Sequence, residues 1–188
     1  MLMARHGKLL FRKLDDSDLG SLTDFCNSCK SLGYTNNSSF ESMKLSQMSF
    51  PYGEFFVGID EETNTIFNVA GIHRVLEINE HAYRALFRGA SLPGYGTGLT
   101  GLRASHQFIY LLNMQIDFIL EHDPKAEFYL TTNHTQLQGK SSRMNDVWCP
   151  RAEKQGIISL IDDNFLYNHT PQRLWKIDVT YYKQWRVL

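Results

Sequence analysis

The chain has 188 residues, of which 43% are hydrophobic, enough for one domain with a sizeable core. Its 19 basic and 20 acidic residues give a formal net charge of −1 without a basic run, which excludes an electrostatic footprint for nucleic acid. No apolar stretch approaches the roughly 20 residues that span a bilayer, and charges interrupt the N-terminus early, so we expect a cytoplasmic protein without a signal peptide or membrane segment.

The three cysteines form a poor disulfide framework because their number is odd. Cys26 and Cys29 have the C-x-x-C spacing, but they lie inside a predicted helix, whereas a redox pair sits where a strand meets a helix N-terminus. A zinc site would need two further ligands, and no second C-x-x-C exists. The histidines show no ligand spacing either, so we predict ordinary thiols and no metal.

The first third of the chain predicts a strand followed by two helices. Apolar residues favour a strand over Lys8–Leu14, and the acidic run Asp15–Asp18 supplies helix N-cap candidates. Helical spacing of apolar residues predicts a helix over Asp18–Leu32, which Gly33 ends. A short helix is expected from Phe40 to Met48.

The central part predicts a β-hairpin and a further strand. Glu54–Asp60 and Thr65–Leu76 read as antiparallel strands joined by the turn Glu61–Asn64. A second turn leads to a strand over Ala82–Ala90. A long apolar-faced helix is then expected over Leu102–His122.

The last third returns the chain to the sheet. A strand over Ala126–Thr132 follows the long helix, and a helical crossover implies that it lies parallel to the strand before the helix. Ser141–Gln155 is plausibly helical, although Pro150 would kink or shorten it. Strands are expected over Ile157–Ile161 and Arg173–Val179, joined by the segment Asp162–Gln172.

The predicted fold class is therefore α/β with an α+β-type mixed sheet, in the order β-α-α-β-β-β-α-β-α-β-β. Its front is antiparallel, its centre parallel and its tail antiparallel. No linker or repeat appears, which predicts a single domain over residues 1–188.

A glycine-dense loop joins the strand over Ala82–Ala90 to the long helix. Gly94, Gly96, Gly98 and Gly101 allow positive φ and close approach of a ligand to the backbone. Free N–H groups and the helix dipole favour anionic oxygen at such a place, although glycines also crowd ordinary surface loops. The loop lacks the G-x-x-x-x-G-K-[ST] pattern of a P-loop.

The order of elements, with this loop, resembles the GNAT N-acyltransferases. In that family a Pro-x-Tyr-like start runs into Gln/Arg-x-x-Gly-x-Gly/Ala, and here Pro93, Tyr95 and Gly101 fall in register. Gly96 stands where Gln or Arg is usual, and Leu99 where the middle Gly is usual. The resemblance implies a GNAT-like acyl-CoA N-acyltransferase fold.

It also implies that acetyl-CoA (coenzyme A) is the co-substrate, with its pyrophosphate on main-chain N–H groups of the loop. The acyl carbonyl would be polarised by the amide of Ser91 or Leu92, the pantetheine arm would lie along Arg88–Ser91, and Arg103 could contact phosphate. The cofactor-binding residues implied are Ser91, Leu92, Gly96, Thr97, Gly98, Leu99, Gly101, Leu102 and Arg103.

A second family motif, Asn-x-x-Ala-x-x-Leu-Tyr-Glu-Lys-x-Gly-Phe, is partly matched. The residues in place are Asn145, Glu153, Lys154 and Gly156. Ala152 stands at the tyrosine that often protonates the departing thiolate, and Trp148 replaces a small residue. Cys149 or a water would have to supply that proton.

For the general base, the resemblance points to a glutamate near the start of the strand that precedes the loop. We expect Glu77 in this role and His73 as the second choice, because an unperturbed imidazole titrates near neutral pH. Glu80 and His81 are further candidates.

The predicted function is transfer of an acetyl group from acetyl-CoA to an amine, on a small molecule or a protein. The alternatives are a catalytically degenerate GNAT-fold module that binds acyl-CoA or a protein partner without turnover, and an unrelated nucleotide binder. No nucleic-acid or membrane partner is expected, and a homodimer is left open.

Overall fold

The computed structural model describes residues 3–34, 39–49, 53–95, 104–133, 144–167 and 169–181. Its strands are β1 (Met3–His6), β2 (Leu9–Lys13), β3 (Glu54–Asp60), β4 (Thr65–Arg74), β5 (Ala82–Ser91), β6 (Glu127–Asn133), β7 (Ile158–Tyr167) and β8 (Thr170–Ile177). Its helices are α1 (Leu19–Ser31), α2 (Phe40–Ser49), α3 (Ala104–His122) and α4 (Cys149–Lys154), with a π-helical turn at Met144–Trp148. None of the described helices is long and apolar enough to cross a membrane.

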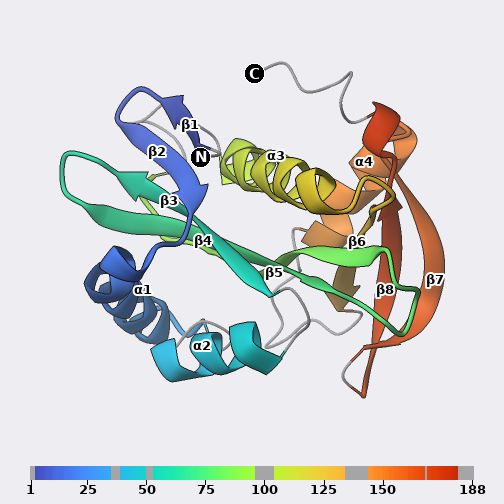
Figure 1. Cartoon of the computed structure of the whole chain (residues 1–188), viewed down its shortest axis with the longest axis horizontal. Helices are drawn as coiled ribbons and strands as arrows, with labels where there is room; N and C mark the ends of the chain where they lie inside the picture. Colours follow the sequence, from blue (N-terminus) through green and yellow to red (C-terminus); the bar gives the residue numbers. More distant parts are fainter. Residues whose placement is uncertain are drawn as a thin grey trace.

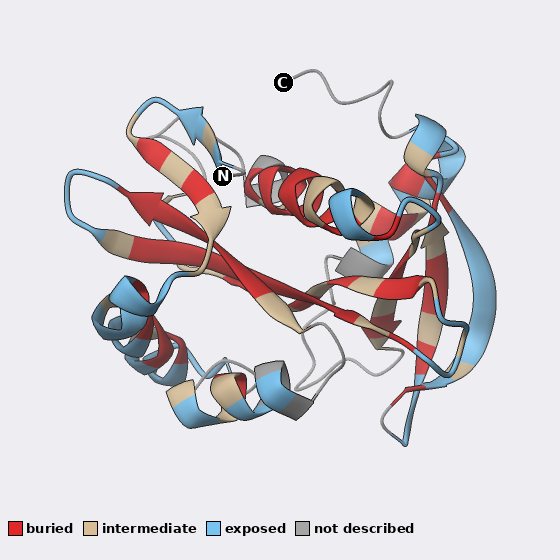
Figure 2. Ribbon diagram, in the orientation of Figure 1, coloured by how far each residue is buried: buried red, intermediate tan, exposed pale blue. Residues whose placement is uncertain are grey.

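One eight-stranded mixed sheet, in the order β1-β2-β3-β4-β5-β6-β8-β7, forms the middle layer. The long helix α3 covers one face, and α1 and α2 cover the other (Figure 1). Burial follows this layering, since the central strands are almost wholly buried while α1 exposes its outer side (Figure 2). A large apolar cluster fills the α3 face, and a second cluster lies beneath α1 and α2.

The predicted central elements are confirmed. β3 and β4 pair as an antiparallel hairpin, β4 pairs antiparallel with β5, and β5 lies parallel to β6 across the α3 crossover. The helix signals in the first third also hold. Asp15 closes a capping box before α1, and Gly33 ends the helix with φ of 75°.

The two cysteines of α1 face the sheet as buried, free thiols. Burial raises the pKa of Cys26 and of Cys29 to about 11, so neither thiol is reactive near neutral pH. The third cysteine, Cys149, is also free and buried.

The first predicted strand is in fact a hairpin, with β1 added at the edge of the sheet. Gly7 takes φ of 58° in the turn, which glycine adopts without a steric penalty. β1 has four mostly exposed residues, so it lacks the apolar alternation by which a strand is found in a sequence.

The prediction that the segment Asp162–Gln172 only joins two strands is wrong in a similar way. It lies largely within the β7–β8 hairpin, which pairs from Ile158–Ile177 to Tyr167–Thr170. β7 is an outer strand whose residues are mostly exposed, so its acidic and polar side chains gave no strand pattern. Within the predicted helix over Ser141–Gln155, α4 starts only at Cys149, with Pro150 in its first turn.

The packing of β3 yields a test of the core. A Cβ at Gly58 would lie 2.8 Å from Phe67 Cζ and 2.9 Å from Phe11 Cε1, whereas a Cβ at Gly20 in α1 would meet nothing within 4 Å. We expect Gly58→Ala to lower the free energy of unfolding by roughly 1–3 kcal/mol through overpacking. Gly20→Ala should raise it by about 0.5–1 kcal/mol, because alanine is the better helix former. Urea unfolding of both variants checks this, and an unchanged midpoint for Gly58→Ala would contradict the packing.

Candidate functional site

The parallel strands β5 and β6 are paired only at their start. The ladder holds three residue pairs and ends at Arg84–Tyr129. Beyond this point β5 continues along β4 as far as Ser91, and β6 continues along β8 as far as Asn133. The two unpaired stretches, residues 85–91 of β5 and 130–133 of β6, form what we call the split.

Two irregularities in β5 explain why it leaves β6. Its ladder with β4 shifts register between Val69 and Gly71 and again between Gly71 and His73, and β5 carries the extra residue each time. Leu86 and Arg88 take φ of 53° and 50°, a left-handed conformation that costs a non-glycine residue about 1 kcal/mol or more. Bulges of this kind bend a strand and increase its twist.

A buried glutamine of α3 satisfies backbone groups at both irregularities. Gln115 Oε1 accepts a hydrogen bond of 3.0 Å from the Leu86 amide, and its Nε2 donates to the Ala70 carbonyl over 3.0 Å. Gln115 is fully buried, so this side chain replaces ladder bonds that the bulged strand cannot make.

The two amides predicted to polarise a carbonyl differ in their availability. The Leu92 amide donates to the Phe67 carbonyl over 2.7 Å, so it belongs to the β4 ladder. Antiparallel residue pairs alternate between bonded and non-bonded, and the next pair is Asn68–Ser91. The Ser91 amide therefore points away from β4, toward the split.

A second buried glutamine anchors the start of the glycine-dense loop. Ser91 Oγ donates to Gln107 Oε1 over 2.6 Å, and Gln107 Nε2 donates to the Tyr95 carbonyl over 2.5 Å. The Tyr95 ring stacks on Phe67 with a centroid distance of 4.8 Å. The end of β5, the loop start and the first turn of α3 are thus held together. Seven predicted cofactor residues lie outside the described residues: Gly96, Thr97, Gly98, Leu99, Gly101, Leu102 and Arg103.

A pocket of about 440 Å³ adjoins this anchor. Its walls come from the last two turns of α1 and from the segment that follows β5. The lining residues are Asn27, Ser28, Ser31, Leu32, Leu92, Pro93 and Tyr95. The lining is neutral, with polar groups on α1 and apolar groups opposite.

On the α1–α2 face, a buried histidine and tyrosine meet beside the split. The Tyr167 hydroxyl lies 2.7 Å from His73 Nε2, and His73 Nδ1 lies 2.8 Å from the Arg74 carbonyl. A carbonyl can only accept, so Nδ1 carries the proton and Nε2 accepts from Tyr167. His73 is 1% exposed, and burial lowers its pKa to about 4. The imidazole is therefore neutral near pH 7.

Two arginines complete this cluster around the ring of Phe87. Arg84 Cζ lies 5.0 Å from the Phe87 ring centroid and 4.3 Å from that of Tyr167. Arg88 Cζ lies 5.7 Å from the Phe87 ring, and Arg88 Nη1 donates to Ser42 Oγ of α2 over 3.0 Å. Burial lowers the pKa of both guanidinium groups.

The preferred base, Glu77, lies exposed in the turn after β4. Burial is the main cause that raises the pKa of Tyr167, and the negative charge of Glu77 adds to the rise. The structure thus brings both predicted catalytic residues, Glu77 and His73, near Tyr167. Their roles stay predictions.

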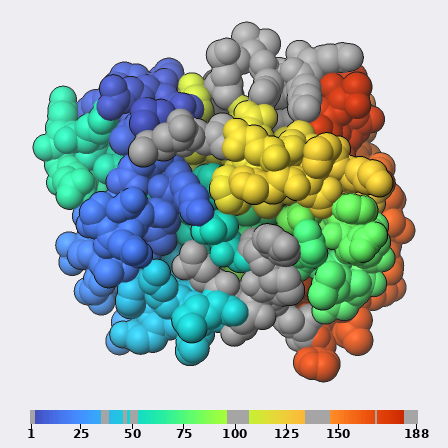
Figure 3. Space-filling model, in the orientation of Figure 1, coloured from blue at the N-terminus to red at the C-terminus, as the bar shows by residue number. Residues whose placement is uncertain are grey.

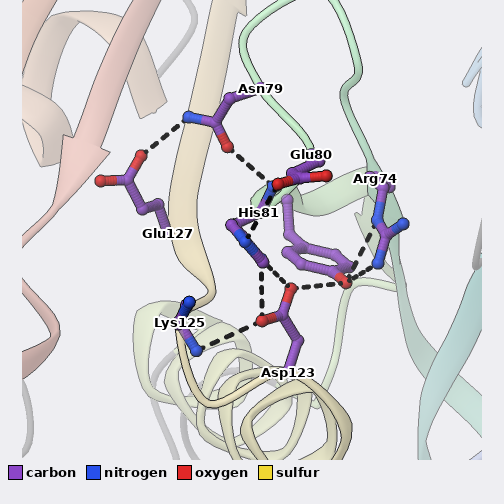
Figure 4. Close-up of polar contacts among 8 residues, drawn as sticks. Arg74, Asn79, Glu80, His81, Asp123, Lys125 and Glu127 are labelled. Carbon is purple, nitrogen blue, oxygen red and sulfur yellow. Dashed lines mark hydrogen bonds and ion pairs between the residues drawn. The ribbon is translucent and has the colours of Figure 1, made fainter.

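The further candidates, Glu80 and His81, belong to a different place. His81 Nδ1 lies 2.9 Å from Asp123 Oδ2 at the end of α3, and Tyr83 donates to the same carboxylate (Figure 4). Burial acts to raise the pKa of Asp123, but the hydrogen bonds from His81 and Tyr83 outweigh it and lower this pKa. α3 lies directly against the β4–β5 turn in the space-filling view (Figure 3). This network joins the turn to α3 at the paired end of β5, away from the split.

Cys149, considered as a proton source, is fully buried in the α3-side core. Burial raises the pKa of Cys149 to about 12, which makes it a poor donor. Ala152 is buried in the same cluster.

Sequence reasoning missed Arg84, Gln107 and Tyr167 as site residues. Their only signal was polarity within apolar strands or helix faces, and Tyr167 lay in a segment expected to be a loop.

Comparison with solved structures gives the class to which this architecture belongs. An acetyltransferase of the GNAT family from Staphylococcus aureus is 13% identical with a TM-score of 0.54, over 90% of this chain and 98% of that one. A ribosomal-protein-S5-alanine acetyltransferase from Vibrio fischeri is 9% identical with a TM-score of 0.56, over 96% and 99%. A spermidine N-acetyltransferase SpeG chimera from Vibrio cholerae and hSSAT is 12% identical with a TM-score of 0.55, over 94% and 99%.

No protein-family model matches the chain, and no curated protein matches it by sequence. The structural likenesses nevertheless extend over nearly the full length of each protein. The chain has the fold of the GNAT acetyltransferases, with a mixed eight-stranded sheet that opens between β5 and β6.

The buried imidazole predicts a pH dependence of stability. His73 has a folded pKa of about 4 and an ordinary value of 6.5, so between these values the unfolded chain binds the extra proton. Stability is then full above the ordinary value and falls with acidification, by roughly 2 kcal/mol between about pH 7 and about pH 5. His73→Gln should remove this slope in urea unfolding, whereas exposed His6→Gln should keep it. A slope that survives in His73→Gln would assign it to another group.

Proposed function

We propose that the protein is an acetyl-CoA-dependent N-acetyltransferase. The observation that carries the proposal is the split, which begins at Arg84–Tyr129 and opens toward the glycine-dense loop before α3. A strand that has lost its neighbour offers backbone hydrogen bonds to an extended amide-bearing arm. Pantetheine is such an arm, and its thioester end would lie in the split.

The loop would hold the pyrophosphate on main-chain amides at the N-terminus of the long helix. Gln107 supports this role, because it fixes both Ser91 and Tyr95 against the first turn of α3. The Ser91 amide, directed toward the split, would polarise the thioester carbonyl. The neutral pocket beside Leu92 and Pro93 has room for uncharged parts of a ligand.

The reaction needs a base for the amine and a proton for the leaving thiolate. Glu77 serves as the base through a water molecule, since it is exposed to solvent, and His73 is the second choice. The thiolate takes its proton from Tyr167, whose hydroxyl would turn from His73 toward the sulfur and so take the place of the missing tyrosine at Ala152. A phenolate formed in this way would lie beside Arg84 and Arg88, which stabilise its charge.

The second candidate is a GNAT-fold module that binds acyl-CoA or a protein partner without turnover. Ala152 favours it, because this side chain cannot donate a proton, and it is buried in the core. The two candidates agree on CoA binding and differ only in catalysis. Release of free thiol with a panel of amines therefore separates them.

Binding is tested first, by thermal unfolding with CoA, acetyl-CoA, ATP and NAD. We expect both CoA compounds to raise the melting temperature and the two nucleotides to leave it unchanged. Gly101→Val should abolish the CoA effect while keeping the unliganded melting temperature, because a branched side chain would block the backbone amides. Gly20→Ala, distant from the loop, should keep the CoA effect. If neither CoA compound stabilises the wild-type protein, both candidates are wrong.

The role of the Ser91 amide is tested by a pair of variants. Ser91→Pro removes the amide without removing a bond from the β4 ladder, and Ser91→Ala removes only the hydroxyl bonded to Gln107. We expect Ser91→Pro to lower kcat by about 10²–10³, the typical effect of losing a carbonyl-polarising donor. Ser91→Ala should lose much less. Equal turnover by the two variants, with both folded by circular dichroism, would rule out this amide.

A further inference from the structure

The side chain of Arg84 lies on the α1–α2 face at the closed end of the split. Its neighbours in β5, Tyr83 and Ala85, belong to the cluster on the α3 face, and side chains alternate between the faces of a strand. Arg84 therefore points to the opposite face. There its guanidinium is stacked against the rings of Phe87 and Tyr167.

Stacking leaves one donor of this guanidinium unused. All five N–H groups lie in the guanidinium plane, so the ring faces of Phe87 and Tyr167 satisfy none of them, and the Tyr167 hydroxyl bonds to another part of the group. Arg84 Nε is fully enclosed, and nothing in the described part of the chain accepts a hydrogen bond from it. A buried donor without a partner is costly, and such exceptions need an explanation.

The charge around Arg84 is also unbalanced. None of the ion pairs among the described residues joins Arg84 to a carboxylate. The groups that face it are neutral His73 and Tyr167, the second cation Arg88, and the exposed carboxylate of Glu77 beside Tyr167. The charge of Arg84 is thus not balanced by an adjacent carboxylate of the described residues, which favours an anion at this place.

We propose that Arg84 binds an oxyanion, a carboxylate or a phosphate, carried by the amine acceptor. The inference rests on the proposed function and names the acceptor class for the same site. A planar guanidinium edge fits two oxygens of such a group, and the unpartnered Nε supplies one of the two bonds. Arg84 is only partly buried as a residue, so part of its side chain is open to a ligand.

The strand also sets the length of the acceptor. Arg84 and Ser91 lie seven positions apart on β5, a span of up to roughly 20 Å that the bulges and the reach of the arginine shorten. An amine that attacks near Ser91 while its oxyanion contacts Arg84 must therefore carry the two groups several bonds apart. Compounds shaped like long ω-amino acids or short peptides meet this requirement, whereas α-amino acids are too short and polyamines carry the wrong charge.

The test compares amines of equal length with and without an oxyanion. The probes are ω-amino carboxylates from glycine to 6-aminohexanoate, aminoalkyl phosphonates of matched length, the corresponding n-alkylamines, and spermidine. We expect kcat/KM to rise with chain length in both oxyanion series and to exceed that of the matched alkylamine by about 10-fold or more, the usual gain from a charged hydrogen bond. The carboxylate and phosphonate series show which oxyanion is preferred.

Arg84→Gln should abolish this discrimination while leaving the KM for acetyl-CoA unchanged. Arg84→Lys keeps the charge but loses Nε and the planar edge, so it should retain only part of the preference. This second variant keeps the test valid if Arg84→Gln fails to fold. The control is Arg5→Gln, an exposed arginine of β1 paired with Glu61, which should behave as the wild type.

Calorimetric titration of the same amines into the protein, with and without saturating CoA, measures the preference when no amine is turned over. A loss of CoA binding with the oxyanion preference intact would refute the proposed function and keep the site. CoA binding with equal or better affinity for alkylamines or spermidine would refute the site. Discrimination that persists in Arg84→Gln would also refute it.

Discussion

The bulged backbone of β5 is the constraint on which the rest of the structure depends. A regular strand would pair with β4 on one side and β6 on the other along its whole length. Two extra residues make this impossible, and β5 stays with β4 while β6 is left to β8. The left-handed conformations of Leu86 and Arg88 are tolerated because packing on both faces determines the path of the strand. Gln115 supplies bonds that the ladder loses at this point.

The α3 face of the sheet contributes mainly to stability, and the α1–α2 face carries the polar groups for recognition. The α3 face is filled by the larger apolar cluster, and its two buried glutamines hold β5, one through a backbone amide at the bulge and one through the Ser91 hydroxyl at its end. On the α1–α2 face the ring of Phe87 forms a base for polar groups, with His73 at 4.9 Å edge-on and the two arginines nearby. An apolar ring of this kind holds cations and a neutral imidazole in fixed positions without neutralising them. The site is therefore positively charged before any ligand binds.

Local signals in the sequence predicted those elements whose own residues carry the pattern. The β3–β4 hairpin, the Asp15 cap and the stop at Gly33 are of this type, and so is the α3 crossover that makes β5 and β6 parallel. The outer part of the β7–β8 hairpin, within Asp162–Gln172, was missed because β7 is exposed at the sheet edge and owes its pairing to β8. The site shows the same limit. His73 could be proposed from its chemistry, but its contact with Tyr167 joins residues 94 positions apart, and no spacing rule reveals such a pair. The bulges of β5 were equally hidden, since Leu86 and Arg88 have no preference for left-handed backbone.

The alanine at position 152 does not by itself decide against catalysis. Acyl transfer requires a proton donor near the leaving sulfur, and the fold can supply one from any element that reaches the split. α4 cannot do so, because Ala152 and Cys149 are both turned into the core and burial raises the pKa of Cys149 to about 12. The hairpin β7–β8 brings Tyr167 over Arg84 instead. Burial raises the pKa of this phenol, while the adjacent guanidinium favours the phenolate that donation would leave behind. A carboxylate-bearing acceptor on Arg84 would weaken that stabilisation, so acceptor binding and proton donation compete for the same cation. The charge of Arg88 also favours the Tyr167 phenolate, so Arg88 can stabilise it while Arg84 binds the acceptor. This division gives a physical reason for two arginines at one site.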